Sequence, residues 1–157
     1  MVLSSILEKY QRQPENLIHI LLEYQQSKDQ NYISEAEVIH ISRELNIPES
    51  QIYTIMTFYS LFSLTPRGKY IIQVCNDVPC HVQGAADIVE MLEDSLKITM
   101  GETTPDGLFT LEYTSCIGCC DKAPAIRIGT EVFGHLTETE ISRIITRFRR
   151  EYDAARE

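Results

Sequence analysis

The sequence predicts an α/β protein in two parts, a small N-terminal helical bundle over residues 1–66 and an α/β sandwich over residues 67–157. Three observations lead to this fold class. Apolar residues recur at helical spacing in the first part, the spacing changes after Pro66-Arg67-Gly68, and strand and helix patterns then alternate to the C-terminus. A chain of 157 residues can bury a core as one domain or as two small ones, without covalent crosslinks.

Four helices are expected in the first part. The first is short and lies near Ser4–Gln11. Pro14 and Pro48 each open another, because a proline fits the first helical turn, where its missing N–H costs no hydrogen bond. Ser34 and Glu37 have the spacing of a capping box at the start of the remaining helix. The side chains expected on the inner faces of the three longer helices are Leu17, Leu21, Tyr24, Val38, Ile41, Leu45, Ile52, Ile55 and Tyr59.

The run Thr57-Phe58-Tyr59-Ser60-Leu61-Phe62 near the end of the bundle is rich in aromatic residues. Core packing is its expected role, because large aromatic side chains dominate the apolar area that a core buries. A docking surface for a partner protein is the alternative.

A strand and a helix are expected to open the second part. Tyr70–Val74 is almost continuously apolar, which is typical of a buried strand, and Cys75 stands at its carboxyl end. A helix follows from Val82 with its inner face on Val82, Ala85, Val89, Leu92 and Leu96. The first cysteine pair, Cys75 and Cys80, is therefore expected in the loop between them.

A second strand, a hairpin and a terminal helix complete this part. Leu108–Ser115 alternates in polarity and leads directly into Cys116. Gly129-Thr130 separates two apolar runs and predicts the hairpin. Thr137 and Glu140 match a second capping box. The side chains expected to face the core are Phe109, Leu111, Tyr113, Ile141, Ile144 and Phe148.

Four cysteines in two short pairs carry the chemistry. Cys75 and Cys80 form one pair, and Cys116 forms the other with either Cys119 or Cys120, since the run C-I-G-C-C leaves both possible. Both pairs follow strands that a parallel sheet would bring to one edge. Thiolates in two local pairs suit a [2Fe-2S] cluster, in which each iron takes two protein sulfurs. Backbone N–H donors to these sulfurs are expected at Gly84, Gly118 and the turn of residues 80–82.

Two other uses of the cysteines remain open. The chain could instead be a structural docking subunit whose four cysteines hold zinc or stay empty, although zinc knuckles favour C-x2-C spacing and neither pair has it. A thiol–disulfide exchange module would use Cys116 and Cys119, which do have that spacing. His81 follows Cys80 directly and is expected to stabilise the loop, not to bind iron.

Composition limits the function further. The 23 acidic and 14 basic residues give a net charge of -9, which argues against binding nucleic acid. Five cysteines in two local clusters indicate a reducing compartment. The N-terminus has no targeting pattern and no apolar run approaches the length of a membrane span, so a cytoplasmic protein without direct membrane insertion is expected. No glycine-rich phosphate loop or Ser/His/Asp arrangement is present, so no catalytic residue is expected in this chain.

With these motifs, the sequence strongly resembles the thioredoxin-like [2Fe-2S] ferredoxin subunit of complex I-type NADH dehydrogenases (the NADH-quinone oxidoreductases), of NAD-linked and electron-bifurcating hydrogenases and of NAD-dependent formate dehydrogenases. The resemblance covers nearly the whole chain. Besides the cysteines, it rests on Pro14-Glu15-Asn16-Leu17-Ile18, Thr57-Phe58-Tyr59-Ser60, Pro66-Arg67-Gly68-Lys69, Cys80-His81-Val82-Gln83-Gly84-Ala85, Asp106-Gly107-Leu108-Phe109-Thr110-Leu111 and Cys116-Ile117-Gly118-Cys119-Cys120 with Ala123-Pro124-Ala125.

The resemblance implies a ligand set. The second cysteine pair of these subunits is C-x3-C, which implies that the cluster ligands here are Cys75, Cys80, Cys116 and Cys120. Cys119 then fills the position of a small residue that is not a ligand. Gln83 departs from the pattern, because relatives often carry arginine there.

The resemblance also implies a thioredoxin-like [2Fe-2S] ferredoxin domain at residues 67–157 behind the helical bundle. It implies a heteromeric NAD(H)-dependent oxidoreductase, of NADH dehydrogenase, hydrogenase or formate dehydrogenase type. A partner flavoprotein subunit would bind FMN and NAD(H) and carry a [4Fe-4S] cluster, alongside further iron–sulfur subunits. This chain would supply an electron-transfer centre and not the hydride site.

Overall fold

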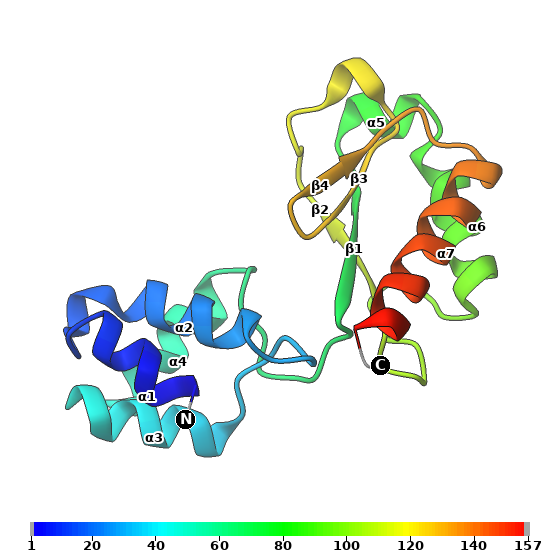
Figure 1. The fold of residues 1–157 in the computed structure, drawn as a ribbon. Coiled ribbons are helices and arrows are strands. Elements are labelled where there is room, and N and C mark those ends of the chain that lie inside the picture. Colours follow the sequence, from blue (N-terminus) through cyan, green and yellow to red (C-terminus); the bar gives the residue numbers. More distant parts are fainter. Residues whose placement is uncertain (1, 156–157) are drawn as a thin grey trace. The chain divides into compact units, whose positions relative to one another are not determined.

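The computed structural model describes residues 2–155, which divide between Arg67 and Gly68 into two compact units (Figure 1). Each unit buries its own apolar cluster. The mixed α/β content, with a four-stranded sheet in the second unit, confirms the predicted fold class. None of the helices in the described range is long and apolar enough to cross a membrane.

The first unit is a helical bundle. Its helices are α1 (Val2–Lys9), the short 3-10 helix η1 (Pro14–Asn16), α2 (Leu17–Gln26), α3 (Glu35–Leu45) and α4 (Glu49–Phe58). The capping box of Ser34 and Glu37 is present at the start of α3. The core consists of Leu3, Ile6, Leu7, Leu17, Ile20, Leu21, Ile33, Val38, Ile41, Leu45, Ile52, Met56 and Phe62.

The end of α4 differs from the prediction. The helix stops at Phe58, and Tyr59 has extended backbone angles of φ -92° and ψ 117°, so the helical spacing no longer carries Tyr59 inward. Met56, one turn after Ile52, fills the core position instead. Phe58 is 77% exposed, so core packing was the wrong prediction for most of this aromatic run.

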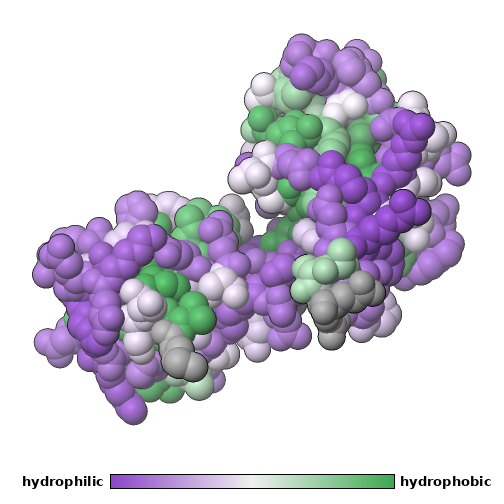
Figure 2. All heavy atoms as spheres, in the orientation of Figure 1, coloured by the Kyte–Doolittle hydropathy of each residue, from purple (hydrophilic) through white to green (hydrophobic). Residues whose placement is uncertain are grey.

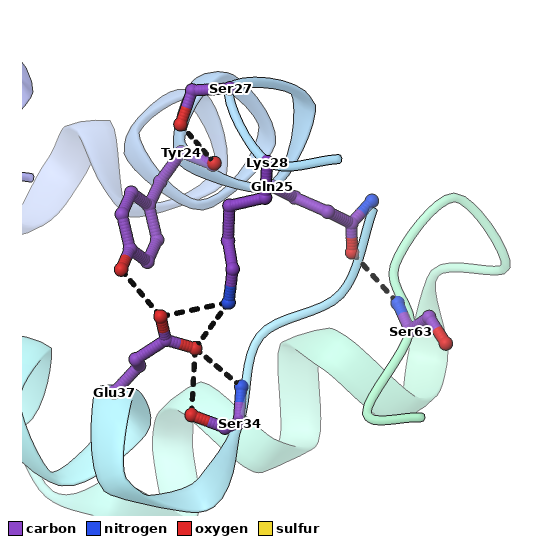
Figure 3. A network of polar contacts seen from close by, with 7 residues as sticks. All are labelled: Tyr24, Gln25, Ser27, Lys28, Ser34, Glu37 and Ser63. Atoms are coloured by element: carbon purple, nitrogen blue, oxygen red, sulfur yellow. Dashed lines mark hydrogen bonds and ion pairs between the residues drawn. The ribbon is translucent and has the colours of Figure 1, made fainter. Parts of the chain in front are cut away.

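One carboxylate joins three parts of the bundle (Figure 3). Glu37 of α3 accepts hydrogen bonds from the Ser34 backbone N–H at 2.7 Å, from the Tyr24 hydroxyl at 2.5 Å and from the Lys28 ammonium group at 2.6 Å. Burial acts to raise the pKa of Glu37, but these hydrogen bonds outweigh it and lower the pKa from 4.5 to about 2. Nearby, the buried Gln25 side chain accepts the Ser63 backbone N–H at 2.9 Å, as Figure 3 also shows.

The second unit is a four-stranded sheet with helices packed on it. Its elements are β1 (Tyr70–Cys75), α5 (Val78–Val82), α6 (Ala85–Leu96), β2 (Phe109–Thr114), the short 3-10 helix η2 (Cys120–Lys122), β3 (Ile126–Ile128), β4 (Glu131–Phe133) and α7 (Glu138–Ala154). The strand order is β2-β1-β3-β4. β1 is parallel to β2 and antiparallel to β3, which forms the predicted hairpin with β4. Helices α6 and α7 lie on the same side of the sheet (Figure 1) and share its core.

The predicted helix from Val82 is α6, which begins at Ala85, and the separate short helix α5 precedes it. Gly84 adopts a φ of 92°, a left-handed conformation that glycine reaches without steric cost, and this turn separates α5 from α6. The expectation that Val82 faces inward is wrong, because its side chain is 74% exposed. Cys80 consequently sits on a short helix and not in an open loop.

The edge strand β2 and helix α7 follow the prediction with two differences. Phe109 and Leu111 are buried, but Tyr113 near the end of β2 is 53% exposed. The Thr137 hydroxyl accepts the Glu140 backbone N–H at 3.3 Å, while the Glu140 carboxylate pairs with an arginine of the next turn. Figure 2 shows mostly hydrophilic residues over α7 on the visible face.

Two arginines of α7 form ion pairs with other elements of the second unit. Arg147 pairs with Glu131 of the hairpin at 2.5 Å, and Arg149 pairs with Asp106 at 2.9 Å. These pairs join α7 to β4 and to the turn before β2. Partly exposed ion pairs of this kind contribute little free energy individually. The buried face of α7, on Ile141, Ile144 and Phe148, packs on the core of the unit.

Candidate metal centre

The two cysteine pairs meet at one edge of the sheet. Cys75 is the last residue of β1 and lies opposite Thr114, the last residue of β2. The Asn76 backbone N–H donates to the Thr114 carbonyl at 3.1 Å, which continues the pairing one residue beyond Cys75. Cys116 follows two residues after β2. The parallel arrangement predicted from the sequence is therefore confirmed, and it brings both loops together.

Cys75 and Cys80 form the inner pair. Each is only 1% exposed, and their thiols are in hydrogen-bond contact. The Cys75 backbone N–H donates to the Ala125 carbonyl at 3.2 Å, and the Ala125 N–H donates to the Cys80 sulfur. The pKa of the Cys80 thiol is raised to about 11, first by burial and then by contact with Cys75, whereas the Ala125 N–H acts in the opposite direction.

Cys116 and Cys120 form the outer pair. Both are exposed, and their sulfur atoms lie 3.5 Å apart. The Gly118 backbone N–H donates to the Cys116 sulfur at 3.4 Å. The hydrogen bond with Cys116 is the main cause of a raised pKa at the Cys120 thiol. Since Cys120 supplies this contact, the structure favours Cys120 over Cys119 as the partner of Cys116.

Cys119 has different surroundings. It is half-buried and packs against a small apolar group made of Cys75, Cys80, Ala85 and Ala125. Cys119 therefore contributes to packing next to the cysteine loops.

Electrostatic contacts cross from one pair to the other. A charge on Cys120 raises the pKa of Cys80, and a charge on Cys75 raises the pKa of Cys120. The Cys80 and Cys120 thiols therefore resist ionisation, because neighbouring thiolates repel one another. A metal centre among them would reverse this effect, since cations favour the thiolate form of their ligands. The donor set therefore fits a cluster of iron ions.

The arrangement is two pairs, not a single four-fold site. Within residues 2–155, no three His, Cys, Asp or Glu side chains are placed to hold one metal ion together. In a [2Fe-2S] cluster each iron takes only two protein thiolates, and bridging sulfides supply the rest. One thiol pair for each iron matches this requirement.

The backbone donors partly match the prediction. Gly118 donates to a sulfur as expected. The Gly84 N–H instead donates to the His81 carbonyl at 3.2 Å. Ala125 takes the donor role at Cys80, and no sequence pattern indicated it, because Ala125 reaches that sulfur only through the pairing of β1 with β3.

Two further residues at the site were missed. The Asp77 carboxylate accepts the backbone N–H of Cys116. Gly134 lies so close to the end of the second cysteine loop that an added Cβ would stand 2.5 Å from Cβ of Lys122. Both contacts join residues far apart in sequence. Only the position of Asp77 before Val-Pro, which is typical of a helix start, gave a local signal.

Comparison with known proteins identifies a protein family that matches this chain. The model of the family described as thioredoxin-like [2Fe-2S] ferredoxin matches residues 3–149. The chain is 34% identical over 108 residues to NADP-reducing hydrogenase subunit HndA of Solidesulfovibrio fructosivorans, covering 69% of this chain and 63% of that relative. It is 32% identical over 149 residues to a subunit of the NADH-quinone oxidoreductase of Rickettsia prowazekii, covering 94% and 84% of the two chains.

A solved structure has the same fold. The crystal structure of an NAD+-reducing [NiFe]-hydrogenase in the air-oxidized state matches with a TM-score of 0.74 and 24% identity, over 90% of this chain. The match takes up only 24% of the hydrogenase chain. This chain therefore spans less than two thirds of the hydrogenase subunit HndA and about a quarter of the hydrogenase chain.

Proposed function

This chain belongs to the thioredoxin-like [2Fe-2S] ferredoxin family, and we propose that it is an electron-transfer subunit carrying one [2Fe-2S] cluster. The ligands in this proposal are Cys75, Cys80, Cys116 and Cys120. The observation that carries it is the convergence of two thiol pairs at the carboxyl ends of β1 and β2. We likewise propose that residues 1–66 form a helical-bundle domain and residues 67–157 the ferredoxin domain.

The residues around the thiols suit a negatively charged group. When bound, the cluster supplies a site that takes up and releases one electron at a time. The backbone N–H groups of Gly118 and Ala125 donate to two of the sulfurs, and such donors stabilise negative charge on them. The burial of Cys75 and Cys80 keeps water from the inner side of the site.

The partner in this proposal is a flavoprotein subunit that binds FMN and NAD(H) and carries a [4Fe-4S] cluster, with further iron–sulfur subunits in the same complex. The names of the relatives support a hydrogenase or NADH dehydrogenase setting. The outer side of the site is open, and next to it α5 exposes Val78 and Val82 at 72% and 74%. Apolar side chains beside an exposed redox site suit a surface that a partner covers. Five free cysteines support a cytoplasmic location.

Metal analysis and electron paramagnetic resonance (EPR) of the full chain test the proposal. Protein purified without oxygen should contain two irons and two sulfides per chain, and reduction should produce an axial or rhombic S = 1/2 signal. Purification from native cells should recover a flavoprotein with it. A colourless protein that holds one zinc ion per chain would contradict the electron-transfer role and leave a docking subunit.

A further inference from the structure

Asp77 occupies the N-cap position of α5 but does not cap that helix. Its backbone angles, φ -81° and ψ 160°, are those of an N-cap residue, and aspartate is among the residue types preferred there. An N-cap aspartate ordinarily accepts a backbone N–H from the first turn of its own helix. No such bond forms at α5. The carboxylate instead accepts the backbone N–H of Cys116, 39 residues further along the chain.

This hydrogen bond joins the two cysteine loops at their ligands. Asp77 lies between Cys75 and Cys80, and its acceptor atom reaches the backbone of the first cysteine of the other pair. The strand pairing of β1 and β2 ends just before, with the bond from Asn76 to Thr114. The bond between Asp77 and Cys116 is thus the next connection between the loops beyond the sheet.

Cys116 depends on this connection more than the buried ligands Cys75 and Cys80 would. Cys75 and Cys80 are buried and are held by their surroundings, whereas Cys116 is exposed and gains little from packing. A hydrogen bond to a charged acceptor contributes more free energy than a neutral one. The carboxylate therefore restrains the position of the outer pair relative to the inner pair.

We propose that Asp77 is a positioning residue that holds the Cys116 loop at the spacing the cluster requires. The inference rests on the proposed function, because it concerns how the proposed ligands are arranged. Asp77 is not itself a ligand, and its proposed role is to hold the two cysteine loops in a fixed relative position. The observation behind this proposal is that the Asp77 carboxylate accepts the Cys116 N–H and makes no capping hydrogen bond to its own helix, α5.

The test compares three full-length variants loaded with iron and sulfide. Asp77→Ala removes the acceptor, Asp77→Asn retains a neutral one, and Asp121→Asn removes an equal charge next to Cys120. Asp121 makes no hydrogen bond to the other cysteine loop in the described part of the chain, so it controls for charge alone. The measurements are the rate of iron loss to a chelator, the width of the EPR signal, and hydrogen exchange at the Cys116 amide before loading.

The expected order follows from the hydrogen bond. Asp77→Ala should lose iron about 10 to 100 times faster than the unmodified chain, which corresponds to the worth of a hydrogen bond to a charged group. Its EPR signal should be broader, because the Cys116 sulfur samples more positions. Asp77→Asn should recover part of both effects, and Asp121→Asn should leave the rate of iron loss within about twofold.

Two results would overturn the inference. One is a rate of iron loss in Asp77→Ala equal to that of the unmodified chain, and the other is an equal acceleration in Asp121→Asn. The Cys116 amide gives a readout that does not depend on the cluster, since its exchange should accelerate in Asp77→Ala before any iron is added. If the unmodified chain binds no iron, the proposed function fails, while accelerated amide exchange would still establish the connection between the loops.

Discussion

Cys119 and Cys120 are adjacent in the chain, yet their side chains have different surroundings. Cys120 contacts the Cys116 sulfur at 3.5 Å, whereas Cys119 packs against buried alanines and the inner cysteines. The two residues therefore form a natural pair of variants. One tests the proposed ligand, and the other serves as its neighbouring control.

We expect Cys75→Ala, Cys80→Ala, Cys116→Ala and Cys120→Ala each to prevent normal cluster assembly, because each leaves one iron with a single protein thiolate. Cys119→Ala should leave the visible absorption and the EPR signal unchanged. Iron content after anaerobic reconstitution is the measurement. Loss of the cluster in Cys119→Ala together with its retention in Cys120→Ala would reverse the assignment of the second pair.

Glu37 predicts how the stability of the first unit depends on pH. Its pKa is about 2 in the folded chain against an ordinary 4.5, so the folded state binds this proton less tightly than the unfolded state. Its stabilising contribution is therefore complete above about pH 4.5 and disappears as the pH falls through about 2. Glu37→Gln should lower the free energy of unfolding by about 1–2 kcal/mol at pH 7, in the range of a lost capping interaction.

Urea unfolding at several pH values measures this contribution. The difference between the unmodified chain and Glu37→Gln should shrink toward zero near pH 2. Glu35→Gln, in the same helical turn, is the matched control and should change the free energy much less at every pH. A difference for Glu37→Gln that stays constant from pH 7 to pH 2 would show that lost packing, not lost charge, causes the effect.

Single residues could be predicted where their signals are local. Gly118 as a donor follows from its place inside the second pair, and the Ser34 and Glu37 capping box follows from spacing. Asp77 and Ala125 could not be found this way. Each reaches its cysteine partner across the fold, through contacts that depend on how β1, β2 and β3 pair.

At the scale of elements, the sequence predicted the strands and helices that have clear periodicity. It did not predict the residues at which several of the helices begin and end. The hairpin around Gly129-Thr130 pairs Ile128 with Glu131, as a two-residue turn requires. The break between α5 and α6 depends on the left-handed conformation of Gly84. The early end of α4 leaves Tyr59 exposed, although the spacing of apolar residues continues past it. Periodicity alone does not locate such breaks.

The segment between β4 and α7 closely contacts the second cysteine loop. Gly134 has no room for a side chain, because a Cβ would stand 2.5 Å from Cβ of Lys122 and would also meet the Lys122 carbonyl oxygen. The His135 backbone N–H donates to that same carbonyl at 2.8 Å. Gly134→Ala must therefore displace η2, whose first residue is Cys120.

We expect Gly134→Ala to lower the free energy of unfolding by about 1–3 kcal/mol, the usual cost of forcing extra atoms into a packed site. It should also accelerate iron loss, since the displaced segment carries a proposed ligand. Thr139→Ala, on the exposed start of α7, is the control and should change neither quantity appreciably. Chemical unfolding and chelator assays measure the two effects. An unchanged stability would mean that the loop moves aside freely.

At the scale of the whole molecule, two units with separate cores share one chain. The α/β class and the family could both be predicted from the sequence, because the cysteine pairs and the motifs around them extend over most of its length. The family match to residues 3–149 confirms that prediction. All four proposed ligands lie in the second unit.

This division predicts that residues 68–157 alone fold and bind iron. The fragment contains the whole sheet, α6 and α7, and the buried cluster that they share. We expect it to bind as much iron per chain as the full protein, with the same EPR signal. Residues 1–67, expressed alone, should be helical and bind none. A second unit that is unfolded or free of iron would show that the centre needs the bundle.

Water reaches only one of the two thiol pairs. Cys116 and Cys120 are exposed, whereas Cys75 and Cys80 are almost fully buried against Ala85 and Ala125. An ion or an alkylating reagent that diffuses to the chain before a cluster is bound meets the outer pair first. The outer pair is therefore the accessible side of the site, and the inner pair is its buried side. Oxidants that attack the chain before a cluster is bound should therefore modify Cys116 and Cys120 before Cys75 and Cys80.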